Sequence, residues 1–177
     1  GKGVRVIWLK GETDMLGALE EVESFGEFAK RNNAVASTDV KSFEHLVCTE
    51  QLSRRLGFKV GEELIRVVRV RSLNGNARQV DHGYFLESIA KGLTPEIAAK
   101  SIYDYLEHKR GVKVMASRRT VSVELANDED CSYLDLGKYN CVAVMESQSY
   151  TSDGILFEVT HARTHPEIFH YRVNSKR

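Results

Sequence analysis

The chain has 177 residues, 42% hydrophobic and 28% charged, a composition that is ordinary for a globular protein and excludes a disordered chain or a disulfide scaffold. Lys and Arg together number 25, as do Asp and Glu, so no excess positive charge is available to hold the phosphate backbone of nucleic acid. No apolar run approaches the roughly 18 residues of a transmembrane helix, and the first residues are not a secretory signal, which together indicate a soluble intracellular protein. The three cysteines are widely spaced and without a CxxC pair, which fits a reducing cytoplasm.

Start and stop signals divide the chain into strands and short helices. Ser24-Phe25-Gly26-Glu27 is a capping box, in which a hydroxyl and a carboxylate satisfy free amides at a helix start. Asn74-Gly75 and Asp153-Gly154, each between apolar runs, predict tight hairpins.

In chain order we expect a strand (4–8), a linker (10–14), a helix (24–33), a strand (34–47), a helix (49–56), a hairpin (64–73 with 76–85), helices (from 95, and over 102–110), a strand (112–125), a helix (128–134), a hairpin (141–151 with 155–164) and an edge strand (169–173). Antiparallel hairpins separated by short helices predict an α+β fold with helices packed on one antiparallel sheet.

Two arginines stand side by side on the first strand of the first hairpin. Because side chains alternate across a strand, Arg69 and Arg71 face the same side of the sheet. Guanidinium groups this close repel each other unless water or an anion lies between them, and their planar forks match phosphate oxygens. The pair therefore indicates either a phosphate site or the solvated face of an amphipathic strand. Asp81, on the paired strand, is either a ligand for sugar hydroxyls or a counterion of the arginines.

Other polar residues are candidates for the same site, each with an ordinary structural explanation beside it. Ser24 lies at a helix start, where free amides attract an anion, but it also fits a plain N-cap. Ser101 and Tyr103 begin another helix and suit sugar recognition, and core packing is the alternative. Glu158 and Arg163, on the last hairpin, are sugar ligands or members of ion pairs.

Patterns typical of catalysis are missing from the sequence. No HExxH motif, Gly-x-Ser-x-Gly elbow or phosphate-cradling glycine loop occurs. His161 and His165 have i,i+4 spacing, but on a predicted strand that spacing does not form a metal-binding face. Cys131, on an acidic helix, indicates half-buried packing rather than a nucleophile. We therefore expect no enzymatic activity, no cofactor and no metal.

The order of these motifs resembles the UTRA domain of the HutC subfamily, within the GntR superfamily of transcriptional regulators. The resemblance covers about residues 20–175 and rests on Ser24-Phe25-x-Glu27-Phe28, Arg69-x-Arg71-x-x-x-Gly75, Gly92-Leu93-Thr94, Ser101-Ile102-Tyr103 and Tyr133-Leu134-Asp135-Leu136. It implies a chorismate-lyase-like fold and an effector-binding, dimerising domain over residues 16–177. It further implies that residues 1–15 end a winged-helix wing and form a linker, so that operator DNA is bound by a domain upstream and not by this segment.

Within the subfamily the pattern is similar to that of trehalose-operon repressors, which implies a phosphosugar effector, in first place trehalose 6-phosphate. The resemblance assigns the phosphate to Ser24, Phe25, Arg69 and Arg71, and the sugar to Asp81, Ser101, Tyr103, Glu158 and Arg163. It also implies a homodimer that does not bind membranes. The alternatives are a sensor of glucosamine 6-phosphate or of a catabolite, and a chorismate-lyase-like enzyme, which the fold alone suggests.

Overall fold

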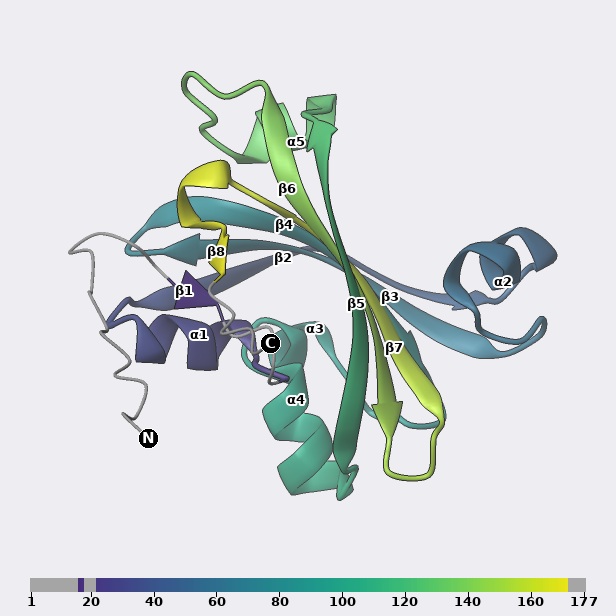
Figure 1. The fold of residues 1–177 in the computed structure, drawn as a ribbon. Helices are drawn as coiled ribbons and strands as arrows, with labels where there is room; N and C mark the ends of the chain where they lie inside the picture. Colours follow the sequence, from purple (N-terminus) through teal and green to yellow (C-terminus); the bar gives the residue numbers. More distant parts are fainter. Residues whose placement is uncertain (1–15, 18–21, 172–177) are drawn as a thin grey trace, which may run out of the picture.

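Six antiparallel strands form the strongly twisted sheet around which the chain is organised (Figure 1). In the computed structural model, which describes residues 16–17 and 22–171, the strand order is β2-β3-β4-β7-β6-β5. The bounds are β2 (Ala36–Val47), β3 (Glu63–Leu73), β4 (Asn76–Leu86), β5 (Val114–Leu125), β6 (Cys141–Thr151) and β7 (Leu156–Thr164). The expected antiparallel sheet is confirmed, whereas the strand and linker expected over residues 4–14 lie outside the described residues.

Local signals in the sequence form the turns and caps that they predict. Asn74 and Gly75 adopt φ values of 50° and 81°, the left-handed pair that a two-residue hairpin turn needs and that Asn and Gly accept most readily. The turn pairs Leu73 with Asn76, and the register of β3 against β4 then shifts by one residue at a bulge between Arg71 and Ser72. At the first helix, the Ser24 hydroxyl accepts from the Glu27 amide at 3.3 Å while the Ser24 amide donates to the Glu27 carboxylate at 2.8 Å.

The helices are short and lie around the sheet, with α2 and α5 at well-separated places (Figure 1). Their bounds are α1 (Phe25–Arg31), α2 (Glu50–Leu56), α3 (Pro95–Ala98), α4 (Ile102–Asp104) and α5 (Asp128–Tyr133). The helix expected over residues 102–110 is α-helical only at Ile102–Asp104 and continues as a π-helical turn at Tyr105–Lys109. No helix in the described part of the chain is long and apolar enough to cross a bilayer.

Two sequence expectations differ from the structure. The expected edge strand near the C-terminus is β8 (His170–Tyr171), which pairs in parallel with β1 (Leu16–Gly17) in a separate two-stranded sheet and does not extend the main one. Cys131, expected to be half-buried, is exposed on α5. Both features depend on long-range packing, about which local sequence patterns carry little information.

Apolar side chains bury both faces of the sheet, in two separate clusters. Ile65 and Val67, on the face of the two arginines, belong to a cluster that includes Ile102 and Leu106 of the α4 segment. Val68 and Val80, on the other face, pack with residues around α5 such as Leu134. The alternation of β3 predicted from sequence is therefore confirmed, and it leaves Arg69 and Arg71 on the same face as Ile65 and Val67.

A glycine in β4 makes room for a buried aromatic ring. A Cβ added at Gly83 would lie 2.7 Å from Cε2 of Phe85, which is fully buried. Because the ring cannot move without disturbing the core, we expect Gly83→Ala to lower the free energy of unfolding by about 1–3 kcal/mol, measured by urea denaturation. Gly26→Ala is the control, since nothing lies within 4 Å of its Cβ position, and we expect it to stabilise α1 by up to about 1 kcal/mol. Equal effects of the two substitutions would contradict the steric explanation.

Candidate functional site

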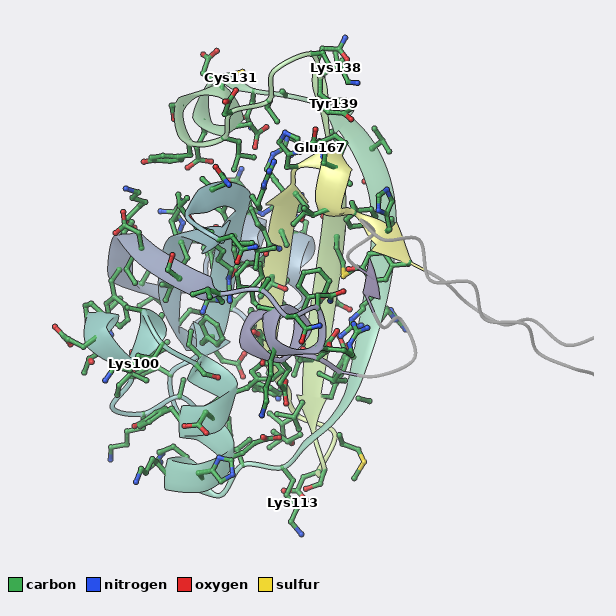
Figure 2. All side chains as sticks on the ribbon, turned by 90° about the vertical axis from the view of Figure 1, so that its left-hand side faces the viewer. Lys100, Lys113, Cys131, Lys138, Tyr139 and Glu167 are labelled. Carbon is green, nitrogen blue, oxygen red and sulfur yellow. The ribbon has the colours of Figure 1, made fainter. Side chains whose placement is uncertain are left out.

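A cavity lies on the arginine face of the sheet, lined by residues of α1 and of the segment that starts α4. Figure 2 shows these helices in front of the sheet, with Lys100 of the cavity lining labelled beside α4. The cavity brings together all the predicted site residues except Arg163: Ser24, Phe25, Arg69, Arg71, Asp81, Ser101, Tyr103 and Glu158. Residues far apart in the sequence thus meet in one concave place, as a ligand site requires.

Both arginines are held by one oxygen of Asp81. Its Oδ2 atom accepts a hydrogen bond from Arg69 Nη2 at 2.5 Å, and from Arg71 Nε at 3.1 Å and Nη2 at 2.9 Å. Arg69 and Asp81 are 3% exposed, and the Arg71 side chain is 14% exposed, so this is not the solvated face of a strand. Two guanidinium groups share a single carboxylate, which leaves one positive charge uncompensated within the group, and Glu158 is a further carboxylate of the cavity that acts electrostatically on Arg69 and Arg71.

The protonation of the group follows from burial and from the charges within it. Burial raises the pKa of Asp81, but Arg69 and Arg71 together outweigh it and hold that pKa below its ordinary value. Burial, followed by the neighbouring Arg69, lowers the pKa of Arg71 to about 10, so this guanidinium is still protonated at neutral pH. Arg69 Nε is buried, with no hydrogen-bond partner among the described residues. An anion in the cavity would therefore be attracted to this group.

The start of α1 lies against the exposed part of this ion group. The Arg71 guanidinium carbon is 5.2 Å from the centre of the Phe25 ring, a cation–π contact that fixes where the guanidinium points. The Ser24 hydroxyl oxygen caps α1 by accepting from Glu27, which leaves its hydrogen available as a donor. Ser24 and Phe25 therefore have ordinary structural roles that do not prevent either from contacting a ligand.

Tyr103 and Glu158 form a second polar group in the cavity. The Tyr103 hydroxyl donates to Glu158 Oε2 at 2.5 Å and lies 3.1 Å from the Ser149 hydroxyl, so it already has partners within the protein. Burial and then the nearby Glu158 raise the pKa of Tyr103 well above its ordinary value. Burial also raises the pKa of Glu158, although hydrogen bonds with Tyr103 and Ser149 favour its charged form. Ser101 caps α4, accepting from the Asp104 amide at 3.1 Å.

Arg163, expected in the same site, lies on the opposite face of the sheet. Arg163 and Glu158 are five residues apart on β7, and an odd separation places two side chains on opposite faces. Arg163 Nε donates to Asp130 of α5 at 2.9 Å, and Nη1 bonds to Glu124. It lines a second cavity, together with residues of α2 and α5. Arg163 therefore does not reach the cavity that holds the other predicted site residues. Its role in the structure is the ion pair with Asp130, which joins α5 to the sheet.

Several residues that line the cavity were missed from the sequence. Thr160 shares the parity of Glu158 on β7, so strict alternation was a signal that could have identified it. Ser117, Arg119 and Ser147 reach the cavity only through the pairing of β5 with β6 and of β6 with β7, which no local pattern reveals. Across residues 16–17 and 22–171, no three His, Cys, Asp or Glu side chains gather as metal ligands.

Comparison with known sequences identifies similar proteins over most of the chain. The sequence profile of the UTRA domain matches residues 31–170. The HTH-type transcriptional regulator TreR of Bacillus subtilis is 28% identical over 148 residues, which are 84% of this chain and 62% of TreR. The HTH-type transcriptional repressor NagR of B. subtilis is 22% identical over 147 residues, 83% of this chain and 60% of NagR. The chain thus spans less than two thirds of the length of these curated relatives.

Solved structures share the architecture. The effector-binding domain of the B. subtilis trehalose repressor superposes with a TM-score of 0.70 at 27% identity, over 80% of this chain and 98% of that domain. A possible transcriptional regulator from B. subtilis, YydK, superposes with a TM-score of 0.78 at 22% identity, over 94% of this chain and 70% of YydK. The second likeness, at this identity, shows the fold alone.

The raised pKa of Glu158 predicts a dependence of stability on pH. A folded-state pKa above the ordinary value of 4.5 means that the folded protein holds this proton more tightly than the unfolded chain, so Glu158 opposes folding increasingly as pH rises from about 4.5 through the folded-state pKa. We therefore expect wild type to lose stability relative to Glu158→Gln between about pH 4.5 and pH 8, in urea denaturation. Glu107→Gln, an exposed carboxylate outside the cavity, controls for removing one charge. If wild type instead became more stable than Glu158→Gln as the pH rises, the fold would stabilise the charged form of Glu158, and the prediction would be contradicted.

Proposed function

The chain belongs to the UTRA domain family, and on that premise we propose that it senses a phosphosugar as the effector-binding domain of a GntR/HutC-type transcriptional repressor. In this proposal the effector is trehalose 6-phosphate and the protein has no enzymatic activity. A separate winged-helix domain binds operator DNA, and the repressor acts as a cytoplasmic homodimer. The observation that carries the proposal is the buried Arg69–Asp81–Arg71 group, whose uncompensated positive charge lines the cavity.

Charge and geometry support a phosphate as the anionic part of the ligand. Asp81 neutralises one of the two guanidinium groups, so an anion gains the attraction of the remaining charge without unpairing Arg69. Arg71 is the better-placed ligand, because part of its side chain is exposed to the cavity and it donates through a planar fork. Hydrogen bonds to charged groups contribute about 1.5–3 kcal/mol each. The sequence resemblance assigned Asp81 to the sugar. In this proposal Asp81 instead positions the two arginines and does not contact the sugar.

The remaining polar groups support a sugar beside the phosphate. Tyr103 and Glu158 line the cavity and share a hydrogen bond, which Ser149 behind them extends, and groups such as Tyr103 and Glu158 accept from and donate to hydroxyls with fixed direction. The TreR and NagR relatives are both named as regulators. The name of the similar trehalose repressor domain favours trehalose 6-phosphate over other phosphosugars for this chain.

Ligand binding would act on α1, because this helix supplies Ser24 and Phe25 to the cavity. A phosphate held jointly by Arg71 and Ser24 would fix the start of α1 against the sheet. A ligand shifts an equilibrium between two arrangements only by the difference in its affinity for them. We propose that the arrangement with α1 docked binds the phosphosugar more tightly and is the one that releases operator DNA.

Thermal unfolding with a panel of ligands tests this function. At 100 times its dissociation constant, a ligand adds about 2.7 kcal/mol of stability, so trehalose 6-phosphate should raise the melting temperature measurably. Free trehalose should raise it much less, because it lacks the anion. Equal shifts for both would contradict the phosphate anchor. A larger shift with glucosamine 6-phosphate would keep the phosphosugar class and replace the sugar.

The role of Arg71 has a matched control on the same strand. Arg71→Ala should weaken the affinity for trehalose 6-phosphate at least tenfold, because at least one charge-assisted hydrogen bond is lost. Arg66→Ala removes an arginine of β3 that lies on the other face, paired with Glu44, and should leave the affinity unchanged. Calorimetric titration of both variants checks this. An equal loss for the two would indicate a general effect of charge instead of a site.

A further inference from the structure

The cavity floor is divided between two kinds of chemistry. On β3 and β4 it carries the ion group and Gln79. On β5, β6 and β7 it carries the hydroxyl groups of Ser117, Ser147, Thr160 and Thr164, the charged Arg119 and Glu158, and the apolar Met145 and Ala162. The first half holds two arginines that share one carboxylate, whereas the second half offers several hydroxyl groups and one charge of each sign, which suit a polyhydroxylated ligand.

Strand register places these hydroxyls in two rows across the sheet. Glu158 pairs with Ser149, and Ser149 pairs with Ser117. In the adjacent row on the same face, Thr160 pairs with Ser147 and Ser147 with Arg119. Each row therefore runs from the wall formed by Tyr103 and Glu158 toward the outer strand β5.

A buried hydroxyl at the far end of the first row lacks a partner. Ser117 Oγ is inaccessible to solvent and has no hydrogen-bond partner among the described residues, yet Ser117 lines the cavity. A buried polar atom left unpaired costs about 1–3 kcal/mol, so such an atom is expected to have a function or a missing partner. A change of the Ser117 side-chain rotamer would turn Oγ toward the cavity, where a hydroxyl of a bound ligand would supply that partner.

The distance from the phosphate to Ser117 is too long for one sugar ring. Ser117 lies two strands beyond Glu158, which adds about 10 Å at the usual spacing between strands. A hexose phosphate anchored at Arg71 would place its ring near Tyr103 and Glu158 and would end there. The floor beyond, over β6 and β5, remains for a further part of the ligand.

Aromatic side chains stand beside the hydroxyl rows. Phe169 and Tyr171 both line the cavity, with their ring centres 4.9 Å apart in an edge-to-face contact. Arg119 of β5 acts electrostatically on Tyr171, and so do Glu23 and Arg31 on the side of α1, so this aromatic pair lies within reach of both α1 and the β5 end of the floor. Apolar ring faces beside a few fixed polar groups are the usual composition of small-molecule sites.

We infer that Ser117, Ser147 and Arg119, with Phe169 and Tyr171, form a subsite for a second sugar ring, here called the β5 subsite. The effector would then be a phosphorylated disaccharide that lies across the sheet, with its phosphate on β3 and its outer ring on β5 and β6. The inference rests on the proposed function and adds to it the residues that distinguish a disaccharide phosphate from a monosaccharide phosphate.

Calorimetric titration of the chain with trehalose 6-phosphate and with glucose 6-phosphate tests the β5 subsite. Ser117→Ala should weaken the affinity for trehalose 6-phosphate about five- to tenfold, the effect of one hydrogen bond. It should leave the affinity for glucose 6-phosphate within about twofold, since that ligand ends before Ser117. Ser147→Ala should behave in the same way. Ser122→Ala is the matched control, because Ser122 is exposed and its position on β5 gives it the opposite parity.

The outcomes separate the subsite from the function as a whole. Ser117→Ala should not lower the melting temperature of the unliganded protein, because it removes an unpaired polar atom. If this variant does not fold, the affinities of Ser147→Ala for the two phosphosugars test the β5 subsite in its place. Equal effects on both phosphosugars, or on neither, would overturn the β5 subsite while the phosphosugar function stands. Absence of binding by both ligands to the wild type would overturn the proposed function and the subsite together.

Discussion

A single oxygen of Asp81 binds both guanidinium groups on the cavity face of the sheet, and the rest of the site depends on this contact. Buried charges persist only when they are paired and hydrogen-bonded, and removal of one partner typically destabilises a protein by about 3–5 kcal/mol. The contact itself depends on register, since Arg69 pairs directly with Asp81 across β3 and β4. A shift of one residue would move every one of these side chains to the other face. The Asn74-Gly75 turn and the bulge between Arg71 and Ser72 set that register together, so both determine the electrostatics of the cavity.

The number of carboxylates distinguishes two ion groups with buried arginines in the described part of the chain, one on each face of the sheet. The outer face is the one that carries Arg163, and the inner face is the one that carries Arg69 and Arg71. On the outer face, Arg163 bonds to both Asp130 and Glu124, so its positive charge is more than compensated and it joins α5 to the sheet. On the inner face, Arg69 and Arg71 share Asp81. The chemistry of the bonds is the same in both places, but only the inner group retains a positive charge. The cavity on the Arg163 face is also lined by Arg55, Arg66 and Arg118, so the anion is assigned to the other cavity because the buried arginine pair that shares one carboxylate lies there together with the other predicted site residues.

Local sequence patterns predicted most of the elements, because caps and turns depend on neighbouring residues. The capping box at Ser24, the Asn74-Gly75 hairpin and the common face of Arg69 and Arg71 follow from rules that act over a few positions. The pairing of β5 with β6, which brings Ser117 into the cavity, is a long-range contact that these rules do not reach. The misplacement of Arg163 was avoidable, since its odd separation from Glu158 already placed it on the other face. The bonds of the Tyr103 hydroxyl, by contrast, needed three-dimensional coordinates.

The most direct test of this account is the free energy of unfolding of Asp81→Asn, measured in urea without and with trehalose 6-phosphate. The account predicts a loss of about 3 kcal/mol or more without ligand, because two buried guanidinium groups then lose their shared counterion. It also predicts that the phosphosugar restores more stability to the variant than it adds to wild type, because a second positive charge then faces the phosphate. A variant as stable as wild type, or one to which the phosphosugar adds nothing, would contradict it.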